Sequence, residues 1–251
     1  MKRTASLAGA LLLLALPLVC HPQQRALKPG EYVTEKGWGH LSLQRSRNGQ
    51  LNFSLTAVGA NAHTCDLDGE IGSRGQTVLV DDSGATDGAC VIDFRARGRD
   101  VEVRHNNAPS CASHCGARAR FEGLYLRPSP SCHPARRDKT RAAFKRLYDA
   151  GEYARAAALL QPVIEQCAPL LSWTEAGWLR NDLALAKYRK GDRAGCQAML
   201  APLAGDAGKT DTELREQWAA EPMLEDTYFG VVRATRTNLG LCQAEGRPAP
   251  P

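Results

Sequence analysis

The chain has 251 residues and a formal net charge of +5, from 32 Lys and Arg against 27 Asp and Glu. Hydrophobic residues make up 43% and charged residues 24% of the chain, which is typical of a folded soluble protein and excludes a disordered one. Four of the cations precede residue 29, so the remainder is nearly balanced and lacks the basic stripe of a nucleic-acid-binding protein. We expect no nucleic acid among the partners, and the length suits two small domains.

Residues 1–24 have the pattern of a signal peptide. Lys2 and Arg3 precede the apolar stretch 7–19, which is shorter than the ~20 residues that span a bilayer. The pattern is of bacterial type, so we expect export to the periplasm. Two alternatives stay open at its end: plain cleavage within 20–24, or a lipoprotein signal with a lipid anchor on Cys20. Only the second alternative brings the protein to a membrane.

The cysteines agree with export. Of nine cysteines, eight remain when Cys20 is set aside. An even number in an oxidising compartment predicts a disulfide framework. The eight residues are Cys65, Cys90, Cys111, Cys115, Cys132, Cys167, Cys196 and Cys242.

Residues 29–127 alternate between apolar and polar side chains. Leu51, Phe53 and Leu55 are separated by polar residues, and a period of two predicts half-buried strands. Asn48-Gly49 is a strong hairpin signal. We count about eight short strands, by this periodicity, in an antiparallel meander. The first part of the chain is therefore predicted to be a small antiparallel β-barrel or sandwich.

The period changes after residues 128–137, which are rich in proline and are predicted to be a linker. Residues 138–246 have helical periodicity. A shift of 40 residues places Tyr148 on Tyr188 and Gly151 on Gly191. The repeat resembles tetratricopeptide-type helical hairpins, with a closing helix at 224–242; the alternative is a plain helical bundle. The fold class is thus two-domain, all-β and then all-α.

The repeat also predicts disulfides. In a stack of hairpins, the end of one helix lies near the start of the helix two places along. This arrangement predicts the pairs Cys132–Cys167 and Cys196–Cys242. For the β domain we predict Cys111–Cys115 and Cys65–Cys90.

Few residues indicate catalysis. Cys111, His114 and Cys115 have a weak zinc-like spacing, but disulfides are favoured in an oxidising compartment. Asp66, Asp68 and Glu70 share one face of a strand, where a solvated surface is favoured over an acid–base pair. The sequence has no nucleophile elbow, zinc-protease motif or phosphate-binding glycine loop. We predict no catalytic residue, no metal and no cofactor, and we expect a non-enzymatic protein, with a hydrolase or metal binder as the remaining alternative.

Three features indicate a binding surface. The acidic loop 81–88 suits insertion into a basic cleft, with a solvated turn as the alternative. A stack of hairpins offers a concave groove for a peptide or protein, and tryptophans often anchor interfaces, although on helices they more often belong to the core. The candidate binding residues are Asp81, Asp82, Ser83, Asp87, Trp173 and Trp178.

Residues 111–125, CASHCGARARFEGLY, resemble the Cys-x3-Cys-Gly-x-x-Ala-x-Phe-x-Gly-x-Tyr ending of uncharacterised secreted bacterial proteins of lysozyme-inhibitor type. The stretches TRAAFKRLYDAGEY and WLRNDLALAKYRKGD are similar to a helical extension that some of them carry. The resemblance implies a disulfide-rich β-barrel that binds an enzyme. The inhibitory motif of that family is Ser-Gly-x-x-Tyr, whereas this chain has Asp87 at the position of the tyrosine.

We therefore expect a non-enzymatic periplasmic interaction protein. In the first interpretation it is an inhibitor or immunity-type protein, whose partner is a peptidoglycan hydrolase or a toxin. In the second it is an envelope scaffold or assembly factor that binds a protein partner through its helical repeats.

Export can be tested with a reporter. Residues 1–28 fused to an alkaline phosphatase that lacks its own signal should give active enzyme, because that reporter needs an oxidising compartment for its disulfides. Activity is measured in intact cells, with a fusion of residues 29–56 as the control. Activity no higher than that of the control would contradict the signal-peptide interpretation.

Overall fold

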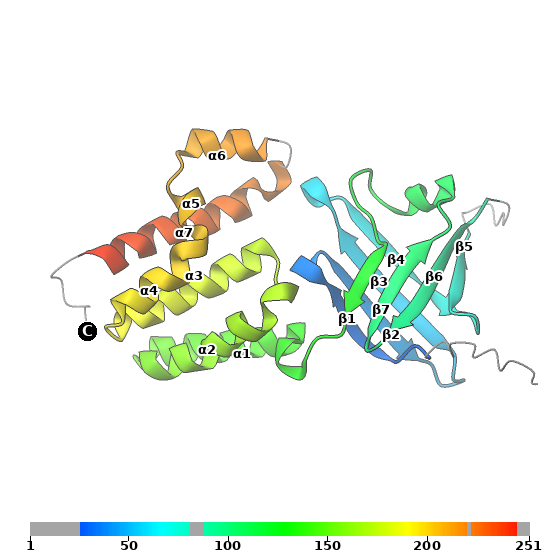
Figure 1. Ribbon diagram of the computed structural model, residues 1–251, viewed down its shortest axis with the longest axis horizontal. Coiled ribbons are helices and arrows are strands. Elements are labelled where there is room, and N and C mark those ends of the chain that lie inside the picture. Colours follow the sequence, from blue (N-terminus) through cyan, green and yellow to red (C-terminus); the bar gives the residue numbers. More distant parts are fainter. Residues whose placement is uncertain (1–25, 81–87, 220–221, 245–251) are drawn as a thin grey trace, which may run out of the picture.

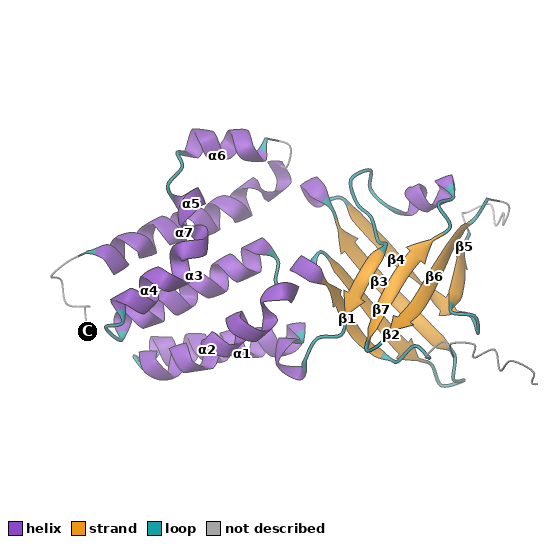
Figure 2. Cartoon of the chain, viewed as in Figure 1, coloured by secondary structure: helices purple, strands orange, loops and turns teal. Residues whose placement is uncertain are grey.

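The computed structural model describes residues 26–80, 88–219 and 222–244. Within these residues, an eight-stranded antiparallel sheet that nearly closes into a barrel is followed by seven α-helices. Figure 1 and Figure 2 show the barrel and the helical region side by side, with β1 and its neighbouring loops facing the helices. The change from a period of two to a helical period therefore marks a real change of architecture.

The barrel is a meander in which the first strand meets the last. The strand order is β4-β3-β2-β1-β8-β7-β6-β5, and the pairing of β1 with β8 joins the two halves of the sheet. The strands are β1 Gly30–Thr34, β2 Gly39–Arg45, β3 Leu51–Val58, β4 Thr64–Ile71, β5 Gln76–Leu79, β6 Cys90–Arg97, β7 Asp100–His105 and β8 Gly123–Leu126.

Alternation of side chains fills the barrel, as the sequence predicts. Leu55 pairs with Leu41 on one side and with Leu67 on the other, and all three side chains are buried. Between β2 and β3, the predicted Asn48-Gly49 turn is confirmed, with Gly49 at φ +84°, a conformation that glycine adopts at little cost.

The two outer strands of the sheet, β4 and β5, leave a gap in the barrel wall. The short helix η3 Pro109–His114 and the residues after it are bonded to both sides of this gap. One disulfide joins Cys90, at the start of β6, to Cys111, and another joins Cys65, on β4, to Cys115. In addition, the N–H of Gly116 donates to the Thr64 carbonyl at 2.8 Å. Covalent bonds thus connect the two sides that no strand ladder joins.

The predicted pairs Cys111–Cys115 and Cys65–Cys90 are therefore wrong. Cys65 and Cys90 lie on opposite sides of the gap, and each instead bonds to the segment between them. The sequence indicates which cysteines belong to the β domain, but not that β1 pairs with β8 and leaves β4 and β5 as the edges.

The helical region begins earlier than the predicted linker ends. α1 starts at Pro134, because proline fits the first helical turn, where its missing N–H is not needed. Both disulfides predicted here, Cys132–Cys167 and Cys196–Cys242, are confirmed. The helices are α1 Pro134–Asp149, α2 Tyr153–Cys167, α3 Trp173–Arg189, α4 Arg193–Leu200, α5 Ala204–Ala207, α6 Asp211–Trp218 and α7 Glu225–Gln243.

The two matched turns have the same hydrogen bonds. The N–H of Gly151 donates to the Tyr148 carbonyl at 3.0 Å, and the N–H of Gly191 donates to Tyr188 at 2.9 Å. Both glycines have positive φ, +75° and +89°. The 40-residue shift therefore relates two helical hairpins, α1–α2 and α3–α4, that turn in the same way.

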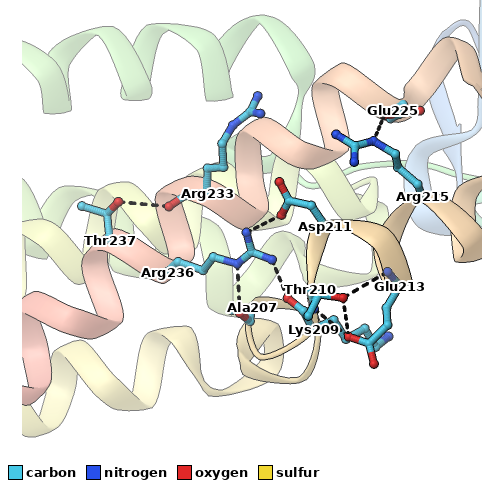
Figure 3. Close-up of polar contacts among 10 residues, drawn as sticks. All are labelled: Ala207, Lys209, Thr210, Asp211, Glu213, Arg215, Glu225, Arg233, Arg236 and Thr237. Atoms are coloured by element: carbon cyan, nitrogen blue, oxygen red, sulfur yellow. Dashed lines mark hydrogen bonds and ion pairs between the residues drawn. The ribbon is translucent and has the colours of Figure 1, made fainter.

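The second helices of the two hairpins differ in length. α2 has 15 residues, whereas α4 has eight and is followed by the short helices α5 and α6. Figure 3 shows the contacts of Arg236 of α7 with the connection between α5 and α6. Its guanidinium donates to the carbonyls of Ala207 at 3.0 Å and Lys209 at 2.5 Å, and to Asp211 Oδ1 at 2.6 Å. One side chain thus fixes the α5–α6 connection on α7.

Barrel and helices touch at two places. Val33 of β1 is only 1% exposed and packs in the core that α1, α2 and α3 share. Beside it, a Cβ on Gly37 would lie 2.8 Å from the Leu170 carbonyl oxygen, so only glycine fits there. Farther along, Asn61 Oδ1 accepts a hydrogen bond from the Met223 N–H at 3.1 Å. The first contact is apolar and the second is polar.

The disulfides at the gap can be removed separately. C65A/C115A should lower the free energy of unfolding by about 2–4 kcal/mol, and C90A/C111A by a little less, because the second bond closes a shorter loop. Urea unfolding followed by circular dichroism measures both variants. An unfolding midpoint equal to that of the unaltered protein, in either variant, would contradict the closing role of that bond.

Candidate functional site

A groove of about 590 Å³ runs between α1 and α3, the first helices of the two hairpins. It is open to solvent along one side of the helical region. Its lining is supplied by α1 except for two residues of α3. The lining residues are Asp138, Arg141, Ala142, Phe144, Lys145, Tyr148, Asp149, Asp182 and Leu185.

Helical spacing brings these side chains together. On α1, Arg141, Lys145 and Tyr148 recur at i, i+4 and i+7, which places them on one face. Phe144 is 6% exposed and belongs to the core that α1, α2 and α3 share. Its ring stacks on that of Tyr148 at a centroid distance of 6.0 Å. The aromatic pair, with Leu185 opposite, gives the groove an apolar floor.

Charged groups stand around this floor. Arg141 Nε lies 2.9 Å from Asp182 Oδ2, so this ion pair joins α1 to α3. Lys145 Nζ lies 2.6 Å from Asp149 Oδ2, within α1. Asp138 forms no ion pair within the described part of the chain. The groove thus combines an apolar floor with a charged rim, an arrangement that suits a segment of another protein.

Asp182 is the most buried carboxylate of the groove. Its side chain is 28% exposed. Burial raises the pKa of this carboxyl above its usual range, and the Arg141 guanidinium lowers it by less. The ion pair therefore offsets only part of the cost of burying the charge.

Neither of the two tryptophans predicted to bind is among the residues that line the groove. Trp178 lies on the same side of α3 as Asp182 and Leu185, at i, i+4 and i+7, and its ring packs on Gly230 of α7. Trp173 is 37% exposed, and its ring centroid lies 4.6 Å from that of Tyr228, so it helps to hold α7. Both tryptophans therefore have a packing contact with α7.

The other candidate residues of the sequence are placed as follows. Asp81, Asp82, Ser83 and Asp87 lie outside the described residues, so the acidic loop stays a prediction. Asp66, Asp68 and Glu70 are exposed along β4, opposite Thr56, Ser54 and Asn52 of β3. This placement agrees with a solvated sheet face.

The cysteine and histidine candidates give no metal centre in the described residues. Cys111 and Cys115 are both in disulfides, which removes the thiolates that zinc would need. No group of three or more His, Cys, Asp or Glu side chains suited to hold a metal ion occurs in the described ranges.

The groove residues themselves were not predicted. The helical period after residue 138 includes Arg141, Tyr148 and Asp182, but a helical period does not show which residues face a core, solvent or a groove. The signal that was present is the face of α3 on which Trp178, Asp182 and Leu185 recur. That face mixes apolar and charged residues, as expected for a partly covered surface.

The comparisons with known proteins give no relative. No family model matches the chain, and neither a curated protein nor a solved structure matches it. Among the described residues, no helix is both long and apolar enough to cross a bilayer. The four disulfides indicate an oxidising, non-cytoplasmic compartment.

The raised pKa of Asp182 predicts a pH dependence of stability. The folded protein holds this proton more tightly than the unfolded chain, so stability falls as pH rises from the unfolded pKa through the folded one. Asp182→Asn should remove this fall and raise the free energy of unfolding at neutral pH. The partner Arg141 is exposed, and its lost ion pair should cost only about 0–1 kcal/mol.

Urea unfolding between pH 3 and pH 7 measures this effect. Asp226→Asn, an exposed carboxylate at the start of α7, is the matched control and should keep the pH dependence of the unaltered protein. If the pH dependence of the free energy of unfolding is the same in the Asp182→Asn variant, burial does not raise the pKa of this carboxyl.

Proposed function

We propose that this protein is an exported, non-enzymatic interaction protein that binds a segment of a partner protein in the groove between α1 and α3. The observation that carries the proposal is the apolar floor of Phe144, Tyr148 and Leu185 within a charged rim. Apolar anchors surrounded by polar groups are typical of protein interfaces.

The groove stands on a rigid support. The Cys132–Cys167 disulfide ties the segment before α1 to the end of α2. α3 begins with a capping box, in which Ser172 and Glu175 exchange side-chain and backbone hydrogen bonds. Fixed helices lose little freedom when a partner binds, which favours affinity.

Export to the periplasm is part of the proposal. It is supported by the signal-like pattern of residues 1–24 and by the four disulfides. The lipid anchor on Cys20 remains an alternative to plain cleavage.

Of the two interpretations of the sequence, the helical groove supports the scaffold or assembly factor. The disulfide-closed barrel then acts as a stable support beside the binding region. The inhibitor interpretation depends on the loop 81–88, most of which lies outside the described residues, and on the resemblance to lysozyme-inhibitor-type proteins. It stays a prediction with a different binding surface.

Partner capture tests the groove. The tagged mature chain should retain a periplasmic protein, identified by mass spectrometry, and Leu185→Arg should abolish its capture by placing a charge on the apolar floor. The matched control is Leu124→Arg, at a 47%-exposed leucine of β8, which should leave capture intact.

Each variant is first checked for an unchanged thermal unfolding midpoint. Capture that survives Leu185→Arg but is lost when Asp81, Asp82 and Asp87 are replaced together would overturn the groove proposal and favour the inhibitor interpretation.

A further inference from the structure

We propose that the groove selects a partner segment in which a Lys or Arg side chain lies beside a large apolar side chain, and that this cation replaces Arg141 on Asp182. The inference rests on the proposed function, because it names the chemistry that the same groove would recognise. Three features of the lining carry it: an incompletely neutralised carboxylate, a second carboxylate, Asp138, without an ion pair among the described residues, and an adjoining apolar floor.

The carboxylate of Asp182 has a weak partner. Arg141 is 47% exposed, so its charge is screened by water, while the Asp182 side chain is 28% exposed and has lost much of its hydration. An exposed ion pair contributes little, and a partly buried carboxylate keeps a desolvation cost that such a pair does not fully offset. A cation that is itself covered by a bound segment would interact with Asp182 in a less polar environment and therefore more strongly.

The lining has three carboxylates and two cations, and a third cation, Arg189 of α3, hydrogen-bonds the lining residue Tyr148. The lining carboxylates are Asp138, Asp149 and Asp182, against the cations Arg141 and Lys145. Lys145 is paired with Asp149, and Asp138 has no ion pair among the described residues. When Arg141 leaves Asp182, Asp138 lines the same groove, three residues before Arg141 on α1, and can receive it. The exchange therefore leaves no cation without a carboxylate.

The apolar side chain of the segment has a defined place. Tyr148 and Leu185 line the same groove as Asp182, and the ring of the buried Phe144 stacks on that of Tyr148. A cation on Asp182 thus brings the neighbouring side chain of the segment over this floor. Burial of a large apolar side chain there supplies the nondirectional part of the affinity.

The same geometry disfavours an acidic segment. Such a segment would bind by drawing Arg141 away from Asp182, and this would leave a mostly buried carboxylate beside a second negative charge. Removing one partner from such an ion pair lowers stability by more than the intact pair raises it, because a buried charge is left unpaired. The groove therefore selects against acidic partners as well as for cationic ones.

Three capped peptides test the inference on the full mature chain by ¹H–¹⁵N NMR titration: acetyl-Leu-Arg-Phe-amide, acetyl-Leu-Glu-Phe-amide and acetyl-Ser-Arg-Ser-amide. The first should shift amides of α1 and α3 and bind about tenfold more tightly than the other two, since a charge-assisted contact and an apolar contact each contribute about this much. Asp182→Asn should weaken the first peptide to the level of the Glu peptide, whereas the control Asp226→Asn should not.

Arg141→Gln separates exchange from direct contact. If the cation of the peptide replaces Arg141, this variant should bind the Arg peptide several-fold more tightly, because no internal cation competes for Asp182. Arg141→Lys, which keeps the competing charge, should bind it like the unaltered protein. Weaker binding by Arg141→Gln, with its fold confirmed by circular dichroism, would overturn the exchange.

The outcome is distinguishable from failure of the proposed function. Equal binding of the Arg and Glu peptides, or shifts in neither α1 nor α3, would overturn the charge selection. Partner capture that Leu185→Arg abolishes would still stand in that case. Conversely, the Arg peptide can shift α1 and α3 only if the groove is a binding surface, so that result supports both.

Discussion

The closure of the barrel is the constraint on which the arrangement of the chain depends. Pairing of β1 with β8 brings the two ends of the β domain together and leaves β4 and β5 as facing edges. Exposed sheet edges invite pairing with other chains. Here the gap is crossed by η3 and the disulfides Cys65–Cys115 and Cys90–Cys111. A barrel with few residues per strand is thereby closed by covalent bonds where no strand ladder joins its edges.

The same closure positions the helical region. Because β1 and β8 are neighbours, Val33 of β1 and Leu126 of β8 lie together and pack against the core that α1, α2 and α3 share. The chain leaves the barrel at that place, and Cys132–Cys167 fixes its first turn to the end of α2. The helical region is therefore attached to the barrel by packing and not only by the connecting segment. Because its first helix is anchored in this way, the groove is held in one orientation to the barrel.

In the groove, the partly buried carboxylate of Asp182 keeps a desolvation cost, and under the proposed function a bound partner would lower that cost. Asp182 bridges to α1 through Arg141, so the ion pair helps to set the spacing of α1 and α3 in the free protein. Burial of the carboxyl raises its pKa, because the ion pair with Arg141 offsets only part of the desolvation of the charged form. In the proposed complex, a cation of the partner would neutralise Asp182 more fully than Arg141 does, next to the exposed apolar floor.

Local patterns in the sequence determined much of the fold. The alternation around Leu55, the Asn48-Gly49 turn and the helical period after residue 138 depend on neighbours in the chain, so eight strands, the hairpins and the two helical disulfides could be predicted. The matched glycines 151 and 191 likewise required positive φ. Only the tertiary structure decided which strand edges adjoin, and therefore how Cys65 and Cys90 pair. It also decided which side of α1 and α3 remains open. The periodicity of a helix shows which residues share a face, but not what that face packs against.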